Sequence, residues 1–100
     1  MAGVKSKKIR NAARGQECQV RLPGICNGNP ETTVFAHLNG SGMGTKASDL
    51  HGCFACSDCH HWLDGGYTKT HSRDERDFEH LIAMKNTQLL LLDMGLIKVA

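Results

Sequence analysis

Residues 56–64 have the sequence Cys-Ser-Asp-Cys-His-His-Trp-Leu-Asp, a Cys-x-x-Cys pair followed by residues that suit the start of a helix. Tetrahedral zinc sites commonly combine two pairs of ligands, each held by a tight turn that aims both side chains at one point. Cys56 and Cys59 form one such pair, and Cys18 and Cys26 form a wider one with seven residues between them. The sequence therefore predicts a structural Zn²⁺ held by four thiolates.

A fifth cysteine leaves a second ligand set open, because Cys53 and Cys56 are also separated by two residues. Spacing alone permits either Cys53 and Cys56 or Cys56 and Cys59 as the ligand pair. We prefer Cys56 and Cys59, since this choice places His60 directly after the pair at the start of a helix. Cys53 then lies on the preceding strand as a small apolar residue.

The length of 100 residues and the mass of 10.9 kDa fit one small domain. A domain of this size buries a modest core, so a bound metal is a natural extra constraint. An odd number of closely spaced cysteines without a signal-peptide pattern favours metal ligation in a reducing cytoplasm over a disulfide framework. No apolar run approaches the roughly 20 residues of a membrane span, so we expect a cytoplasmic protein with no membrane partner.

Basic residues are concentrated at the N-terminus, although the formal net charge is only +2. Six of the 12 Lys and Arg residues lie within the first 21 positions, against a single acid, Glu17. We expect residues 1–15 to form a basic arm and residues 16–100 to form the single domain. Basic arms often contact nucleic-acid phosphates, although solvated basic tails are also common. Arg10 and Arg14 in this arm and Lys46 after a glycine-containing loop are the candidate nucleic-acid contacts.

The remaining patterns predict an α+β fold with a long C-terminal helix. We expect a small hairpin at residues 18–26, strands at 32–38 and 49–55, and a helix that starts in the Cys56 segment and ends at Gly65. Ser72 and Glu75 fit a capping box for a helix from about Arg73 to Met94. A short helical turn is expected at residues 9–14, Trp62 and Phe78 are expected in the core, and four histidines are expected to be exposed or locally hydrogen-bonded: His51, His61, His71 and His80.

Four residues near the cysteines remain without a role in zinc binding: His37, Asp49, His60 and Asp64. His60 and Asp64 are four residues apart, which places them on one face of a helix. This spacing suits two ligands of one divalent cation, but spacing alone slightly favours an ordinary surface pair.

The segments Ala36-His37, Lys46-Ala-Ser-Asp49-Leu50 and Cys56-Ser-Asp-Cys59-His60, with Asp64 beyond them, resemble the HNH endonuclease pattern of the ββα-metal fold. The chain is most similar to the small YbcO-type nucleases of lambdoid prophages, and residues 12–31 and 93–98 share the resemblance. It implies a zinc-stabilised, treble-clef-like ββα-metal domain with a long C-terminal helix. It also implies a phage or prophage protein that works on DNA in the cytoplasm of a bacterial host.

The resemblance further implies a role for each of the four residues. His37 would be the general base that activates water, a task that suits a neutral imidazole near neutral pH. Asp49 would stand in place of the middle Asn of the motif and orient His37. His60 and Asp64 would hold a catalytic divalent cation such as Mg²⁺ or Mn²⁺. The implied activity is hydrolysis of DNA phosphodiester bonds in phage recombination or processing.

One position departs from the HNH pattern: Ala36 stands where many HNH enzymes carry a His or Asp that also binds the cation. Two protein ligands would then remain, with water and substrate phosphate completing the shell. The main alternative is therefore a zinc-stabilised nucleic-acid-binding accessory protein without catalysis. A third interpretation is a zinc-built adaptor for other proteins.

Overall fold

Two short antiparallel strands, β1 (Val34–His37) and β2 (Gly52–Ala55), lie at the centre of the computed structural model, which describes residues 6–38 and 49–98. The register pairs Val34 with Ala55 and His37 with Gly52, so His37 ends β1 beside the start of β2. All four positions of β2 are buried. A side chain at Gly52 would collide with the ring of Phe35, so the close approach of the strands requires glycine here. Both predicted strands are present but shorter than expected.

Helix α2 (Ser57–Asp64) follows β2 after a single residue, Cys56, which caps it. The Sγ atom of Cys56 accepts a hydrogen bond from the amide of Cys59 at 3.4 Å, and Gly65 ends the helix. Trp62 and Leu63 are buried. The predicted helix in the cysteine segment and its end at Gly65 are therefore confirmed. A 3₁₀ helix (Gly66–Lys69) leads from α2 toward the last helix.

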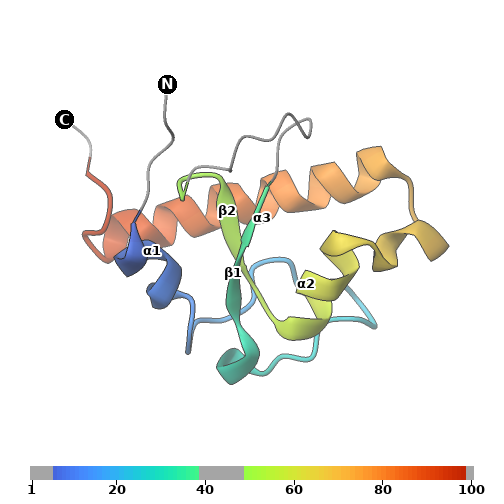
Figure 1. Cartoon of the computed structure of the whole chain (residues 1–100), viewed down its shortest axis with the longest axis horizontal. Coiled ribbons are helices and arrows are strands. Elements are labelled where there is room, and N and C mark those ends of the chain that lie inside the picture. Colours follow the sequence, from blue (N-terminus) through green and yellow to red (C-terminus); the bar gives the residue numbers. More distant parts are fainter. Residues whose placement is uncertain (1–5, 39–48, 99–100) are drawn as a thin grey trace.

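Helix α3 (Arg73–Asp93) begins with the predicted capping box, in which Ser72 and Glu75 bond each other's backbone amides. It runs along the length of the molecule behind the strands (Figure 1). One face packs on β2, and the buried residues of the helix lie on it: His80, Ala83, Thr87 and Leu91. Phe78 is 63% exposed, so its expected place in the core is wrong. The apolar line that begins at Phe78 lies on a different face from the one that meets the sheet.

The N-terminal segment contains helix α1 (Lys7–Ala12), capped by Ser6. Ile9 and Ala13 are buried in a cluster with Phe54 of β2 and Leu91 of α3. The expected helical turn at residues 9–14 therefore starts earlier, and part of the segment expected as an arm packs on the core. A short 3₁₀ helix (Pro30–Thr32) precedes β1.

Residues 18–26 form a turn, so the hairpin expected there is wrong. The amides of Ile25 and Cys26 both donate to the carbonyl of Leu22, which closes the chain locally. The amide of Gln19 bonds the carbonyl of Phe54 in β2, at 2.8 Å. These three amides thus bond a carbonyl within the turn or a carbonyl of β2, and do not pair two arms of a hairpin. The predicted α+β class with a two-stranded sheet and a C-terminal helix is nevertheless confirmed, and no helix among the described residues is long and apolar enough to span a membrane.

A buried hydrogen bond between α3 and β2 gives a test of this packing. The amide of Phe54 donates to the Thr87 hydroxyl at 3.0 Å, so Thr87→Val leaves the amide without a partner. We expect this isosteric change to lower the free energy of unfolding by about 1–3 kcal/mol in denaturant titrations. Thr33→Val is the matched control, because the buried Thr33 hydroxyl has no partner among the described residues. It should be neutral or stabilising, and equal effects of the two variants would contradict the prediction.

Candidate functional site

Four cysteine thiols converge from two separate parts of the chain. The Sγ atoms of Cys18, Cys26, Cys56 and Cys59 all lie within 4.8 Å of one another. Those of Cys26 and Cys56 are 3.8 Å apart, and a tetrahedral ion with metal–sulfur bonds of about 2.3 Å holds its sulfurs at about this separation. None of the five cysteines is in a disulfide. The group could hold a metal ion, and four thiols at this spacing are consistent with zinc.

The local backbone directs these thiols toward one point. Cys56 caps α2 and Cys59 lies in its first turn, while the amide of Arg21 lies 3.5 Å from the sulfur of Cys18. The hydrogen bond with Cys59 lowers the pKa of Cys18, and the same contact raises the pKa of Cys59. Cys18 therefore loses its proton more readily than Cys59, and binding of a metal would require deprotonation of each thiol that ligates it.

Cys53 lies outside the four-thiol group. It is fully buried on β2, and this burial raises the pKa of its thiol. An ionised ligand is therefore disfavoured at this position. The alternative pairing of Cys53 with Cys56 as ligands has no support in the described geometry.

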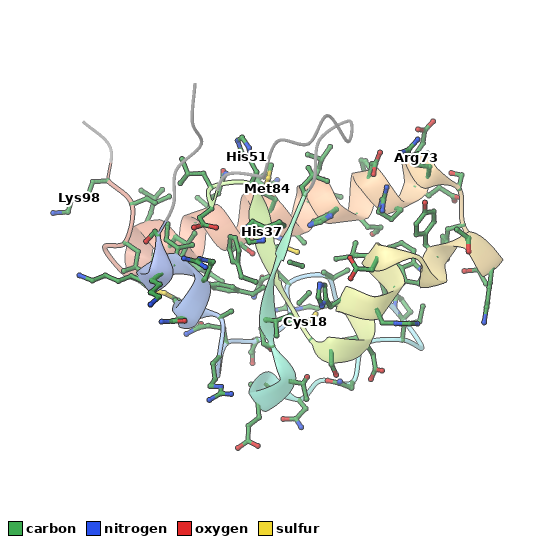
Figure 2. All side chains as sticks on the ribbon, viewed as in Figure 1. Cys18, His37, His51, Arg73, Met84 and Lys98 are labelled. Carbon is green, nitrogen blue, oxygen red and sulfur yellow. The ribbon has the colours of Figure 1, made fainter. Side chains whose placement is uncertain are left out.

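His37 and Asp49 form a close pair beside the end of β1. The His37 Nε2 atom is 2.6 Å from Asp49 Oδ1, and Figure 2 shows His37 at the strand pair, in front of α3. The other Asp49 oxygen accepts the Ser6 amide at 2.6 Å and lies 3.2 Å from Arg10 Nε. Burial raises the pKa of the Asp49 carboxyl. The hydrogen bonds from His37 and Ser6 and the charge of Arg10 lower this pKa by a larger amount, so the net pKa is below its usual range.

This arrangement sets the tautomer of the neutral His37 ring. An ionised Asp49 can only accept hydrogen bonds, so Nε2 carries the proton and donates it. The other ring nitrogen, Nδ1, is then an acceptor, and the His37 side chain is 29% exposed, against 2% for Asp49. A partly exposed imidazole with a fixed tautomer, whose Nδ1 has no hydrogen-bond partner among the described residues, can take a proton from a bound molecule.

His60 and Asp64 lie on the outer side of α2, one turn apart. Their Nε2 and Oδ2 atoms are 3.4 Å apart, with side chains 39% and 68% exposed. Within residues 6–38 and 49–98, the cysteines are the one group of three or more His, Cys, Asp or Glu side chains that could hold a metal. The pair thus offers two donor groups, and its geometry fits both a surface ion pair and two ligands of a cation.

His80 is a buried residue of this region that sequence reasoning missed. It is 4% exposed, so the expectation of exposure or a local bond is wrong for it, while His51 and His61 are exposed as expected. Its Nε2 atom is 3.0 Å from the carbonyl oxygen of Ala36. Burial lowers the pKa of His80, so the ring stays neutral and donates to this carbonyl. Its spacing with Ala83, Thr87 and Leu91 along one helix face was the available signal.

The three residues predicted as nucleic-acid contacts lie in different surroundings. Arg10, at 45% exposed, is paired with Asp49, and Arg14 is exposed just after α1. Lys46 and the glycine-containing loop before it lie outside the described residues.

Comparison with known proteins gives one consistent family. A family model described as "Putative nuclease YbcO" matches residues 7–96. Proteins with this name from Escherichia coli K12 and from Enterobacteria phage 82 are each 46% identical over 100 residues, covering 90% of this chain and 96% of the relative. A solved structure of a "putative bacteriophage protein" from E. coli K-12 is 44% identical with a TM-score of 0.74, covering 88% of this chain and 100% of that one.

Metal content and stability test the four-thiol group. We expect Cys59→Ala to abolish stoichiometric zinc binding and cooperative unfolding, because structural zinc contributes roughly 10 kcal/mol or more to small domains. A strong zinc chelator should unfold the wild-type protein in the same way. Cys53→Ala should keep its zinc, as measured by elemental analysis beside thermal melts. Loss of zinc in Cys53→Ala with retention in Cys59→Ala would contradict this assignment.

The Asp49 carboxylate predicts a defined pH dependence. Its folded-state pKa is lowered, so its stabilising effect is present above the ordinary carboxyl pKa of about 3.9 and is lost as the pH falls through the lower folded value. Asp49→Asn should cost about 1–3 kcal/mol near neutral pH, since an amide group replaces an acceptor facing Ser6 and Arg10.

Denaturant titrations of wild type and Asp49→Asn over a pH series measure this difference, which should shrink below about pH 4. Protonation of the cysteine ligands affects both proteins and cancels in the comparison. Asp93→Asn is the control, because Asp93 is exposed and forms no ion pair with a described residue. A difference that does not change with pH would contradict the role given to Asp49.

Proposed function

The chain belongs to the family described as "putative nuclease YbcO", and we propose that it is a metal-dependent DNA endonuclease of the HNH type that hydrolyses phosphodiester bonds. The proposal includes a place in phage or prophage recombination or DNA processing, in the cytoplasm of the bacterial host. The observation that carries it is the His37–Asp49 pair, a partly exposed imidazole held by a buried carboxylate at 2.6 Å.

The order of elements supports the HNH assignment. β1, β2 and α2 follow one another as a ββα unit, with His37 at the end of the first strand and His60 near the start of the helix. The four thiols meet where β2 leads into α2 of the same unit, which suits a treble-clef-like zinc domain. In this proposal the zinc has a structural role, since four thiolates leave no open position for a substrate.

His37 has the geometry of a general base. Its Nδ1 accepts a proton from water as the water oxygen bonds to phosphorus. The bond from phosphorus to the 3′ oxygen breaks, that oxygen takes a proton from solvent to become a hydroxyl, and a 5′ phosphate remains. Asp49 keeps the proton on Nε2 and favours the imidazolium that forms. His80 holds the carbonyl of Ala36 and so fixes the backbone immediately before the base.

His60 and Asp64 are the residues that would hold a catalytic cation. When bound there, Mg²⁺ or Mn²⁺ would neutralise charge on the phosphate and on the departing oxygen. The pair supplies one nitrogen and one carboxylate, which fits a cation that keeps several waters.

One observation favours a second candidate, a zinc-stabilised nucleic-acid-binding accessory protein without catalysis. Position 36 is Ala, and the part of the chain that the structure describes groups no third ligand with His60 and Asp64. A binding protein, however, has no need of an oriented imidazole at position 37. We therefore place the nuclease first.

Cleavage assays separate the two candidates. The purified wild type should cut supercoiled plasmid or a branched DNA with Mg²⁺ or Mn²⁺, and the cut should disappear when the divalent cation is omitted. His37→Ala should lower the rate by about 100-fold or more, the usual contribution of a general base. His60→Ala should also abolish cation-dependent cleavage, because it removes a proposed ligand of the cation.

His61→Ala is the matched control, because His61 is the exposed neighbour of His60 on α2 and has no role in the proposed chemistry. It should cleave at the wild-type rate, with unchanged zinc content in every variant. DNA binding without cleavage under any cation would instead support the accessory protein.

A further inference from the structure

We propose that the groove between α1 and the start of β1 binds a phosphate of the DNA strand other than the one that is hydrolysed. The groove has a volume of about 530 Å³. The α1 side contributes Arg10, Asn11 and Arg14, and the strand side contributes Thr33, Val34 and Phe35. This inference rests on the proposed function and adds to it where the uncleaved part of the substrate lies.

The groove carries one positive charge, that of Arg14, which no described acidic residue neutralises, beside Arg10, which is paired with Asp49 at 3.2 Å. No acidic residue lines it. Within the described ranges, the exposed side chains of Asn11 and Arg14 form no hydrogen bond or ion pair. Arg10 lies on α1 and Arg14 just after it, and both line the groove. An anion there would meet both guanidinium groups, whose fork suits phosphate oxygens in particular.

Arg10 has donors for two partners at once. Its Nε atom lies 3.2 Å from Asp49 Oδ2, and the side chain is 45% exposed. The two terminal nitrogens of the guanidinium make no bond to a described residue and supply the remaining donors for a ligand. The same side chain can therefore hold the buried carboxylate and face the groove.

The groove lies close to the proposed general base. Val34 lines it at the start of β1, and His37 ends that strand three residues later, a span of about 10 Å. Asp49 connects the two places more directly, because one oxygen is bonded to His37 and the other is paired with Arg10. Phosphates repeat every 3.4 Å or so along the axis for each DNA strand, so a phosphate about three positions away can occupy the groove while another lies at His37.

Arg14 and Arg10 then have separate parts in substrate binding. Arg14 contacts only the phosphate in the groove. It therefore contributes to the affinity for a polynucleotide strand, but not to the affinity for a small phosphodiester that cannot reach the groove. Arg10 is a positioning residue, since a phosphate bound to it also fixes the carboxylate that orients His37. The substrate class that follows is a polynucleotide with at least one phosphate beyond the scissile one.

A charge-matched pair of variants tests the groove by binding alone. Arg14→Gln is compared with Arg73→Gln, since Arg73 is an exposed residue at the end of the molecule opposite α1 (Figure 2). The probe is a fluorescently labelled DNA duplex titrated over a KCl series without divalent cations, so that no cleavage occurs. Arg14→Gln should weaken binding about tenfold and reduce the salt slope by about one, while Arg73→Gln should change neither beyond a small uniform effect.

A kinetic comparison adds a readout that a loss of folding would not produce. Arg14→Gln should raise the KM for plasmid DNA by a larger factor than it lowers kcat, while Arg73→Gln should leave the KM at the wild-type value. Equal affinity and salt slope for the Arg14 and Arg73 variants would overturn the proposed phosphate site in the groove. DNA binding that depends on Arg14, without cleavage by the wild type, would support this site and overturn the proposed nuclease activity. A wild type that binds no DNA at low salt would overturn both proposals.

Discussion

The convergence of four thiols is the constraint on which the rest of the structure depends. It ties the turn at residues 18–26 to the start of α2, two segments that also pack together through Leu22, Trp62 and Leu63. A two-stranded sheet is marginally stable by itself, and a chain of 100 residues buries only a modest core. A metal held by these thiols would therefore contribute directly to the free energy of folding. It would also fix the entry to α2, and with it the position of His60.

Asp49 is a second point where separate segments meet. Its carboxylate is 98% buried and contacts three groups: the backbone amide of Ser6, which is the N-cap residue of α1, the Arg10 side chain of α1 and the ring of His37 on β1. A buried carboxylate is costly unless it is paired and hydrogen-bonded, so these partners account for its ionised state. The same contacts join the basic N-terminal helix to the proposed base. His80 supports β1 from the α3 side through the carbonyl of Ala36, so the backbone at His37 is held from two directions.

The apolar spacing of the long helix α3 predicts the helix but does not determine which of its faces packs on the sheet. Its caps and apolar spacing predict a helix of the observed length, and the structure has it. The residues that pack on β2 are small or polar (His80, Ala83 and Thr87) together with Leu91, because the helix approaches the strand closely and Thr87 bonds its backbone. Larger apolar residues, Phe78 and Leu89 among them, remain 63% and 58% exposed. Hydrophobicity alone does not identify the face that a close helix–strand contact selects.

The sequence by itself determined the features that depend on near neighbours: the Cys56–Cys59 turn, the helix that starts there and ends at Gly65, the capping box of α3 and the approximate place of both strands. Each of these rests on interactions within a few residues, which spacing and residue type reveal. The tertiary structure alone decided the pairing of Ser6 with Asp49 and of His80 with Ala36, which are 43 and 44 residues apart in sequence. It also decided that residues 18–26 form a turn and that α1 packs on the core. Such contacts depend on how distant segments meet in three dimensions, and no local pattern in the chain encodes that meeting.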